Sequence, residues 1–307
     1  MKPLKYIWPI AILIVTLLCS HTHVAAQDII DQSIIEFQAG NLDKAKELID
    51  KGSMLSLYNK EARTWYYKGY IYKELFKERK NESYRDSAIA YLLISIELDN
   101  HNEYKESATK MANFLVSSIF NETAEYFNEL AGKESNLYQV NEATLQHVIE
   151  KYQRFKYLKS RLDPSFNFNK MDEEFYFVAG NVYLALYENS NYENENYREK
   201  IEYYYNRVLE INPKHDKALY NLGIVYYNKA VYLIKNLDYD ADFMELEKKM
   251  DECVNLFEKA LPYIKKSLDV NPQKVEAIRA LKGIYRGLNN YEMVDYYDQQ
   301  LKSLEKR

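Results

Sequence analysis

The sequence is poor in the residues that interrupt regular structure and in the one that cross-links it. Its 307 residues include only 8 glycines, 6 prolines and 2 cysteines. So few turn-forming residues indicate long regular elements joined by few turns, as an all-α protein needs. Because 47% of the residues are hydrophobic and 28% are charged, the chain is able to bury a core and is not disordered.

An excess of basic residues is also missing. The 46 acidic and 41 basic residues are interspersed and leave a net charge of −5. Binding to nucleic acid needs a contiguous row of basic side chains, and electrostatic binding to anionic lipid needs a basic surface. The charge pattern therefore argues against both kinds of partner.

Recognisable catalytic and metal-binding motifs are absent from the sequence. It has no motif that places a nucleophilic serine on a strained strand-to-helix turn, no glycine-rich phosphate loop and no cysteine–histidine pair. Beyond the first 26 residues the histidines are His101, His147 and His215, which lie far apart and not at metal-ligand spacing. We predict that the chain is not an enzyme and holds no cofactor and no metal.

A single apolar run, residues 7–18, stands at the start of the chain. Its 12 residues are too few to span a bilayer comfortably. Lys2 and Lys5 precede the run, and the small residues Ala25 and Ala26 follow it. This pattern predicts a signal peptide over residues 1–26 and a mature chain from Gln27, exported to the periplasm or secreted, without stable membrane insertion.

The two cysteines bear on the same question. An outer-membrane lipoprotein anchored through Cys19 is the alternative, although Leu18 stands where lipoprotein signals carry a small residue. After cleavage only Cys253 remains, which excludes an internal disulfide. Because Asp251 and Glu252 precede Cys253, we expect the pKa of its thiol to be raised and its role to be packing.

Tyrosine is the residue in excess, with 31 copies. A phenol has a flat apolar body and a polar tip, so it packs between helices and still reaches water. The excess fits thin, two-layer packing with half-buried side chains. Recognition through an aromatic surface is the second interpretation.

One pattern of apolar, glycine and proline positions recurs along the chain. Its clearest copy has Leu219, Leu222, Gly223 and Tyr226 on a first helix and Ala260, Ile264, Ser267 and Pro272 on a second. Glycine lets two helix backbones approach closely, apolar residues fill the space between them, and proline ends the second helix. Other copies are Tyr176, Ala179, Gly180 and Tyr183 with Ile201, Tyr205, Val208 and Pro213; Trp65, Gly69 and Tyr72 with Ala88, Leu92 and Ser95; and Ile278, Leu281 and Tyr285.

These positions resemble the tetratricopeptide repeat, a helix–turn–helix unit of about 34 residues. The resemblance implies an α-solenoid of about six antiparallel helix pairs, forming one repeat domain over residues 27–307. The clearest repeats lie at residues 62–100, 173–215, 216–274 and 275–305. Together with the predicted signal peptide and the sequence from Thr64 to Gly69, the pattern resembles that of exported tetratricopeptide proteins of Bacteroidetes-type bacteria.

Two of the repeats are longer than the regular unit. Gly180 and Pro213 are 33 residues apart, and Gly223 and Pro272 are 49 apart, whereas a regular unit has about 24. Helical periodicity continues through the second insertion. We therefore expect both of its helices to be longer by about three turns, so that the pair protrudes as a spike.

The tip of that spike carries Asp238, Asp240 and Asp242, which resemble the first three calcium ligands of an EF-hand loop. The glycine that should follow is Phe243, and the glutamate that should stand twelfth is Lys249. We predict instead a hairpin tip in which Asp242 caps the following helix.

By the same resemblance, the first helix of each pair lines the groove that binds partners. A clamp for a partner's C-terminal carboxylate is not expected: Asn181 and Asn221 match its asparagines, but Phe177, Glu276 and Ala280 replace its basic residues. The predicted groove residues are Arg63, Tyr66, Tyr70, Lys73, Phe177, Asn181, Tyr220, Asn221, Ile224, Tyr227, Asn228, Arg279 and Arg286.

Two functions fit this sequence. The first is a non-enzymatic scaffold of the bacterial envelope that binds a peptide segment or helix of a partner protein in the groove. The second is a carbohydrate-binding or nutrient-uptake accessory protein, with Tyr66, Tyr70, Tyr220 and Tyr227 as sugar-stacking platforms. Both functions leave the identity of the partner and the oligomeric state open.

Overall fold

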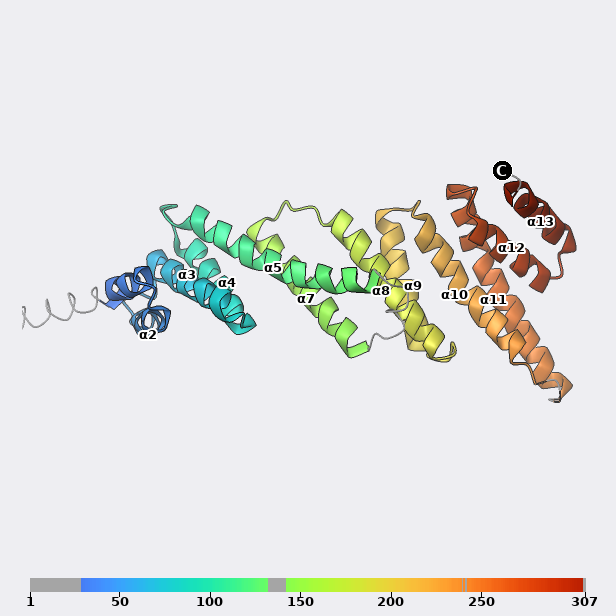
Figure 1. Cartoon of the computed structure of the whole chain (residues 1–307), viewed down its shortest axis with the longest axis horizontal. Coiled ribbons are helices and arrows are strands. Elements are labelled where there is room, and N and C mark those ends of the chain that lie inside the picture. The colour runs from blue at the N-terminus through green and yellow to red at the C-terminus, as the bar shows by residue number, and fades with distance from the viewer. Residues whose placement is uncertain (1–28, 132–141, 239, 241, 306–307) are drawn as a thin grey trace, which may run out of the picture. The chain divides into compact units, whose positions relative to one another are not determined.

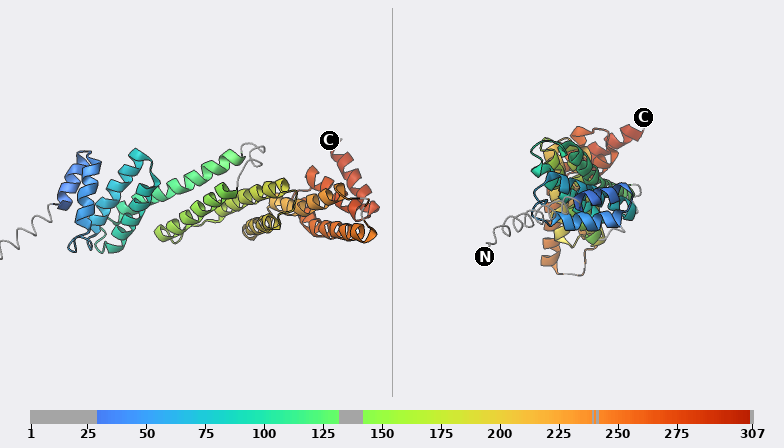
Figure 2. Two further views of the ribbon diagram at one scale, coloured as in Figure 1. Left: turned by 90° about the horizontal axis from the view of Figure 1, so that it is seen from below. Right: turned by 90° about the vertical axis from the view of Figure 1, so that its left-hand side faces the viewer.

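A computed structural model describes residues 29–131, 142–238, 240 and 242–305. Within these ranges the chain consists of helices and connections, with no strand (Figures 1 and 2). The predicted signal peptide, residues 1–26 with Cys19, lies outside the described residues. None of the helices found within those ranges combines the length and the apolar character needed to cross a membrane.

The described chain forms twelve helices in six consecutive pairs, which confirms the predicted all-α fold and the number of pairs. Helices within a pair pack against each other, and in early and later repeats alike a second helix packs against the first helix of the next pair. In order, the pairs are residues 29–38 with α2 (Leu42–Ser53), α3 (Ala62–Arg79) with α4 (Glu82–Leu98), α5 (Lys105–Ala131) with α7 (Glu142–Leu162), α8 (Asn169–Asn189) with α9 (Glu195–Ile211), α10 (Asp216–Lys235) with α11 (Phe243–Val270), and α12 (Val275–Gly287) with α13 (Tyr291–Glu305).

The contacts divide the chain into two units. The first comprises Met1–Glu122 with Tyr152–Phe166, and the second Thr123–Lys151 with Asn167–Arg307. Each unit is described by itself below. One continuous repeat domain over residues 27–307 stays a prediction.

The repeat positions are the core of each pair. In the second unit, a Cβ atom added to Gly180 would lie 2.6 Å from the Tyr205 ring, and one added to Gly223 would lie 2.4 Å from Ile264 Cδ1. Tyr205 and Ile264 are fully buried. The absence of a side chain at each glycine is therefore what brings the second helix of the pair into contact with the first.

The first unit has a core of the same kind with a polar network at its edge. Lys68, which is 6% exposed, lies 3.0 Å from the Asp50 carboxylate and donates a hydrogen bond to Ser53. The Tyr72 hydroxyl also donates to Asp50, at 3.0 Å. Hydrogen bonds from Lys46 and Lys68 lower the pKa of Asp50 although burial alone would raise it. The paired charges stabilise the contact between α2 and α3.

Tyrosine burial goes further than the sequence indicates. Many tyrosines are half-buried, as expected, but Tyr152, Tyr183, Tyr187 and Tyr205 are among the largest fully buried side chains of the described residues. A buried hydroxyl needs a partner, and that of Tyr205 donates to Asn181 at 2.7 Å. The excess of tyrosine therefore builds the core as well as its surface.

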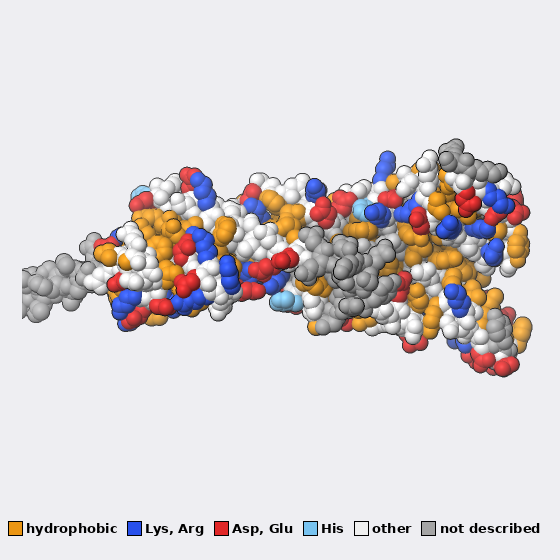
Figure 3. All heavy atoms as spheres, viewed as in Figure 1, with side chains coloured by type: hydrophobic (Ala, Val, Ile, Leu, Met, Phe, Trp, Pro, Cys, Tyr) orange, Lys and Arg blue, Asp and Glu red, His pale blue; other side chains and the backbone are white. Residues whose placement is uncertain are grey.

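The α10–α11 hairpin is the long pair that the sequence predicts, but its extra length is divided unequally. α10 has 20 residues and α11 has 28, whereas the final pair has 13 and 15. The expectation of three added turns in both helices is wrong for α10, because α10 ends at Lys235 and α11 begins only at Phe243. The hairpin end extends past α12 and α13 (Figures 1 and 3).

The start of α11 confirms the predicted cap. The Asp242 side chain accepts a hydrogen bond from the backbone N–H of Glu245 at 3.1 Å. This bond satisfies one of the amides that a helix leaves free at its start. The aspartate-rich sequence is thus a hairpin tip with a helix cap.

Replacing Gly223 by alanine tests the close approach of α10 and α11. The new methyl group would lie 2.4 Å from Ile264 Cδ1 and 3.1 Å from the Ala260 carbonyl oxygen. We expect Gly223→Ala to lower the free energy of unfolding by about 1–3 kcal/mol, against an intrinsic helix preference of about 1 kcal/mol for alanine. Urea unfolding followed by circular dichroism measures the change.

The matched control is the same substitution on the Ile264→Ala background, where the nearest atoms are gone. There Gly223→Ala should destabilise the protein less than in the wild type. Equal losses on the two backgrounds would show that crowding by Ile264 is not the cause.

Candidate functional site

Four predicted groove residues lie on α3 in the first unit, and the two tyrosines among them belong to an aromatic cluster. Tyr66 packs on Tyr104 at 4.9 Å between ring centroids, and Tyr70 packs on Phe37 at 4.8 Å. Arg63 pairs with Asp31 at 2.5 Å. These rings contact neighbouring helices and are only half-exposed.

Lys73 is the fourth of these residues, and it is not available to a partner. It is 9% exposed, pairs with Glu74 at 2.6 Å and lies 4.4 Å from the centre of the Tyr70 ring. Burial lowers the pKa of its ammonium group. The structure therefore gives Lys73 a role in packing.

The other predicted residues lie in the second unit, on α8, α10 and α12, which are the first helices of consecutive pairs. α8 and α10 are joined by Asn221, whose side-chain amide donates to Asn181 Oδ1 and to the Tyr205 hydroxyl, both at 2.9 Å. Asn228 donates to Glu188 at 3.3 Å. The Phe177 ring packs against that of His215, tilted by 41° with 4.8 Å between ring centroids. First helices of adjacent repeats thus lie side by side.

The two asparagines of this network are committed to one another. Asn181 accepts bonds from Asn221 and from Tyr205, while both bonds from Asn221 end on those same two residues. Both N–H donors of the Asn221 amide are therefore used within the protein and are not left for a partner's carboxylate. The network accounts for Asn221 as a structural residue.

α10 and α12 carry the remaining predicted residues. Tyr220, Ile224 and Tyr227 on α10 are half-buried, whereas Arg279 and Arg286 on α12 are exposed. Tyr227 faces Gly283, where an added Cβ would lie 2.4 Å from its hydroxyl. We name these five residues, Tyr220, Ile224, Tyr227, Arg279 and Arg286, the groove surface.

Charge on the groove surface is unbalanced. Among the described residues neither Arg279 nor Arg286 has an ion-pair partner, whereas Lys274 pairs with Asp216 at 3.2 Å and Lys282 pairs with Asp298. Lys274 also lies 4.5 Å from the centre of the Tyr220 ring. Burial raises the pKa of Tyr220 to about 12, so its hydroxyl stays neutral and able to donate at physiological pH.

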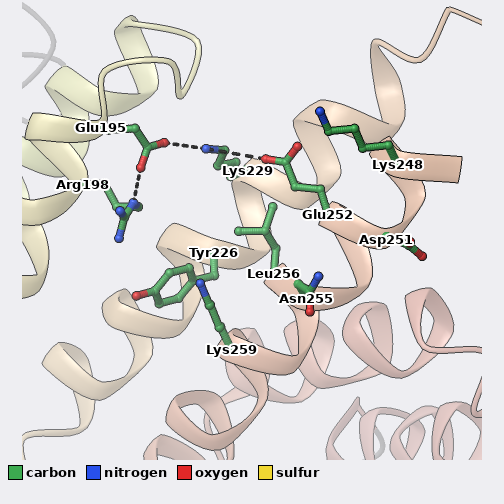
Figure 4. A pocket seen from close by; sticks show the side chains of 10 residues that line it. All are labelled: Glu195, Arg198, Tyr226, Lys229, Lys248, Asp251, Glu252, Asn255, Leu256 and Lys259. Carbon is green, nitrogen blue, oxygen red and sulfur yellow. Dashed lines mark hydrogen bonds and ion pairs between the residues drawn. The ribbon is translucent and has the colours of Figure 1, made fainter. Parts of the chain in front are cut away.

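A pocket that the sequence analysis did not predict lies between α9, α10 and α11 (Figure 4). It encloses about 560 Å³. Lys229 joins its walls through contacts to Glu195 at 2.6 Å and Glu252 at 3.9 Å. The lining residues are Glu195, Arg198, Tyr226, Lys229, Lys248, Asp251, Glu252, Asn255, Leu256 and Lys259.

The pocket's charges neutralise one another. Glu195 also pairs with Arg198 at 2.5 Å, and Arg198 in turn pairs with Glu202. Although burial alone would raise it, hydrogen bonds from Lys229 and Arg198 hold the pKa of Glu195 below its ordinary value. A carboxylate held ionised in this way is a poor general acid or base at neutral pH. The only signal in the sequence was the pair of insertions, which lengthen the repeats from which these walls come.

Other candidate sites have simple structural roles. Cys253 is 2% exposed, and burial, followed by the charge of Glu252, raises the pKa of its thiol, as predicted. His215 accepts a hydrogen bond from the N–H of Ala218 and caps α10. Within the described residues, no three histidine, cysteine or acidic side chains are grouped as metal ligands would be.

Asn221→Ala tests the polar network between α8 and α10. The substitution removes two hydrogen bonds at 2.9 Å beside a fully buried tyrosine, so we expect a loss of about 1–3 kcal/mol in the free energy of unfolding. Asn228→Ala on the same helix removes one bond at 3.3 Å and is the control, with a smaller loss expected. Equal losses in urea unfolding would contradict a special role for the Asn221 network.

Comparison with known proteins gives matches only among solved structures. No protein-family profile matches the chain, and no curated protein sequence matches it. A TPR repeats protein from Bacteroides fragilis is 18% identical, with 85% of this chain and 98% of that one covered and a TM-score of 0.39. PilF of Pseudomonas aeruginosa is 14% identical, with 92% of each chain covered and a TM-score of 0.32. PilW, described as a type IV pilus biogenesis factor, is 12% identical over 91% of this chain and 93% of that one, with a TM-score of 0.31.

The fold can be assigned from the chain's own geometry. Its helices occur in consecutive packed pairs, the glycines predicted to bring paired helices together do so, and first helices of adjacent pairs are joined side by side. The described residues form consecutive antiparallel helix pairs, a helical-repeat fold like that of tetratricopeptide proteins.

Proposed function

We propose that this protein is a non-enzymatic scaffold of the bacterial cell envelope that binds an extended segment of a partner protein on the groove surface. The observation that carries the proposal is the combination of two exposed arginines without ion-pair partners and three half-buried apolar or aromatic side chains beside them. Aromatic residues and arginine are enriched where proteins bind one another.

The spacing of the arginines indicates what they bind. Arg279 and Arg286 are seven residues apart on α12 and therefore lie on one face, about 10 Å apart along the helix. An extended chain advances about 3.3 Å per residue. Side chains of an extended segment alternate between its two sides, so acidic residues two or four apart, about 7 or 13 Å, project together toward the two flexible arginines. A guanidinium binds a carboxylate with two parallel hydrogen bonds.

The tyrosines favour a protein ligand over a sugar. A sugar-stacking platform needs an open ring face, but Lys274 lies over the ring of Tyr220 at 4.5 Å and Lys73 over that of Tyr70 at 4.4 Å. Tyr227 packs against Phe257 and Gly283. Half-buried rings whose faces are covered in this way suit contacts with a peptide better than sugar stacking.

The proposal places the protein in the envelope because of the N-terminal sequence. Lys2, Lys5 and the apolar run of residues 7–18 form the signal on which export depends. A solenoid without enzymatic activity acts there by holding its partner, as a periplasmic or secreted protein.

Affinity capture from an envelope extract tests the groove surface. Purified residues 27–307 and the variant Arg279→Ala/Arg286→Ala serve as baits, and we expect the variant to recover the partner roughly tenfold less, since arginines at an interface centre are often hot spots. Both side chains are exposed, so the variant should retain its fold. Mass spectrometry of the captured proteins gives the ratio.

Lys200→Ala/Lys266→Ala is the matched control, because it removes the same charge from two exposed positions outside the groove surface. It should capture as much partner as the wild type. Equal recovery by the arginine variant and this control would refute the groove assignment.

A glycan array separates the two candidate functions. We expect residues 27–307 to give no signal above background, because lysine side chains cover the ring faces of Tyr70 and Tyr220. Binding that is lost in Tyr220→Ala would instead establish the carbohydrate-binding function.

A further inference from the structure

The end of the α10–α11 hairpin exposes large apolar side chains. Phe243 is 78% exposed, Met244 is 75% exposed and Met250 is 49% exposed, all within the first eight residues of α11. Exposed apolar side chains gathered on one projection mark an interaction site. We name Asp238, Asp240, Asp242, Phe243 and Met244 the hairpin tip.

The hairpin tip is also strongly acidic. Residues 238–252 include seven acidic residues and two lysines, a net charge of −5. Lys249 pairs with Glu245 at 2.9 Å, and within the described residues no ion pair reaches Asp238, Asp240 or Asp242. Figure 3 shows acidic side chains gathered at this end of the hairpin. A surface that covers the tip must be both cationic and apolar.

The groove surface of the same chain has the complementary character. It presents Arg279 and Arg286 without ion-pair partners in the described structure, beside the half-buried Tyr220, Ile224 and Tyr227. Carboxylates at the tip match the guanidinium groups, and the methionine and phenylalanine match the tyrosines and isoleucine.

A continuous stripe on α10 joins the two surfaces. Tyr220, Ile224, Tyr227, Val231 and Ile234 are all half-buried, and they follow one another at intervals of four, three, four and three residues. These side chains pack against the core that α10 forms with α11 and α12, so the stripe is a contact line within the chain. Its 15 residues, Tyr220 to Ile234, span about 21 Å of helix.

We propose that a second copy of this chain docks on the groove surface, with each hairpin tip against the arginines of the other copy. The same two patches meet twice, as a two-fold dimer requires. The inference rests on the proposed function, because it uses the same groove surface. A second copy of the chain and the partner segment compete for that surface.

The contact is small, and its polar part is ionic. A few side chains on each copy bury less area than a permanent interface does, so the dimer should form at high protein concentration. Salt screens exposed charges, so the dimer should dissociate as ionic strength rises. Because a partner and a second copy use one surface, an acidic partner segment should also dissociate it.

Charge reversal in analytical ultracentrifugation is the experiment. Wild-type residues 27–307 should self-associate at low salt, whereas Arg279→Glu/Arg286→Glu and Asp238→Lys/Asp240→Lys should each be monomeric, since like charges then meet at both contacts. Mixing the two variants restores opposite charges at both contacts, so we expect a heterodimer. All substituted side chains are exposed, and circular dichroism checks that each variant is folded.

Three outcomes would overturn the proposal: a monomeric wild type at every concentration, association that survives in both variants, or a mixture that stays monomeric. The proposed function fails separately. A monomeric wild type whose arginine variant still loses its captured partner would remove the dimer and leave the scaffold. Self-association that reversal abolishes, with partner capture unaffected by Arg279→Ala/Arg286→Ala, would remove the scaffold and leave the dimer.

Discussion

The close approach of the two helices within a pair is the constraint on which the rest of the structure depends. It is set by glycines that face fully buried apolar side chains of the partner helix, as with Gly69 and Leu92, and Gly223 and Ile264. Two helix backbones this close leave no room for another layer of side chains between them. Each pair must therefore complete its core against the next pair, which is why the chain is built by repetition.

Tyrosine resolves the problem that such a thin core creates. A two-layer array has few positions far from water, and a side chain with an apolar ring and a hydroxyl fits positions near its edge. Tyr205 shows the deeper use: it fills the space beside Gly180 while its hydroxyl joins α8 to α10 through Asn181 and Asn221. One residue type thus supplies packing within a pair and polar contact between pairs.

Sequence predicted those features that repeat and missed those that depend on single contacts. Repeat positions such as Gly180 and Ile264 predicted the helix pairs, because each position has the same packing role in every repeat. The unequal lengths of α10 and α11 were missed because the pattern of apolar residues does not show where α10 ends, although the cap at Asp242 was predicted. The pocket was missed because Glu195 and Glu252 meet on Lys229 only when the insertions are folded.

The position of Cys253 has a consequence for following the motion of the long hairpin. It is the one cysteine in residues 27–307, it is 2% exposed, and its sulfur lies 3.8 Å from the Ala230 carbonyl oxygen across the α10–α11 contact. A thiol reagent reaches this sulfur only when the two helices separate. The rate of its modification therefore reports how often the hairpin opens, and no cysteine has to be introduced by substitution.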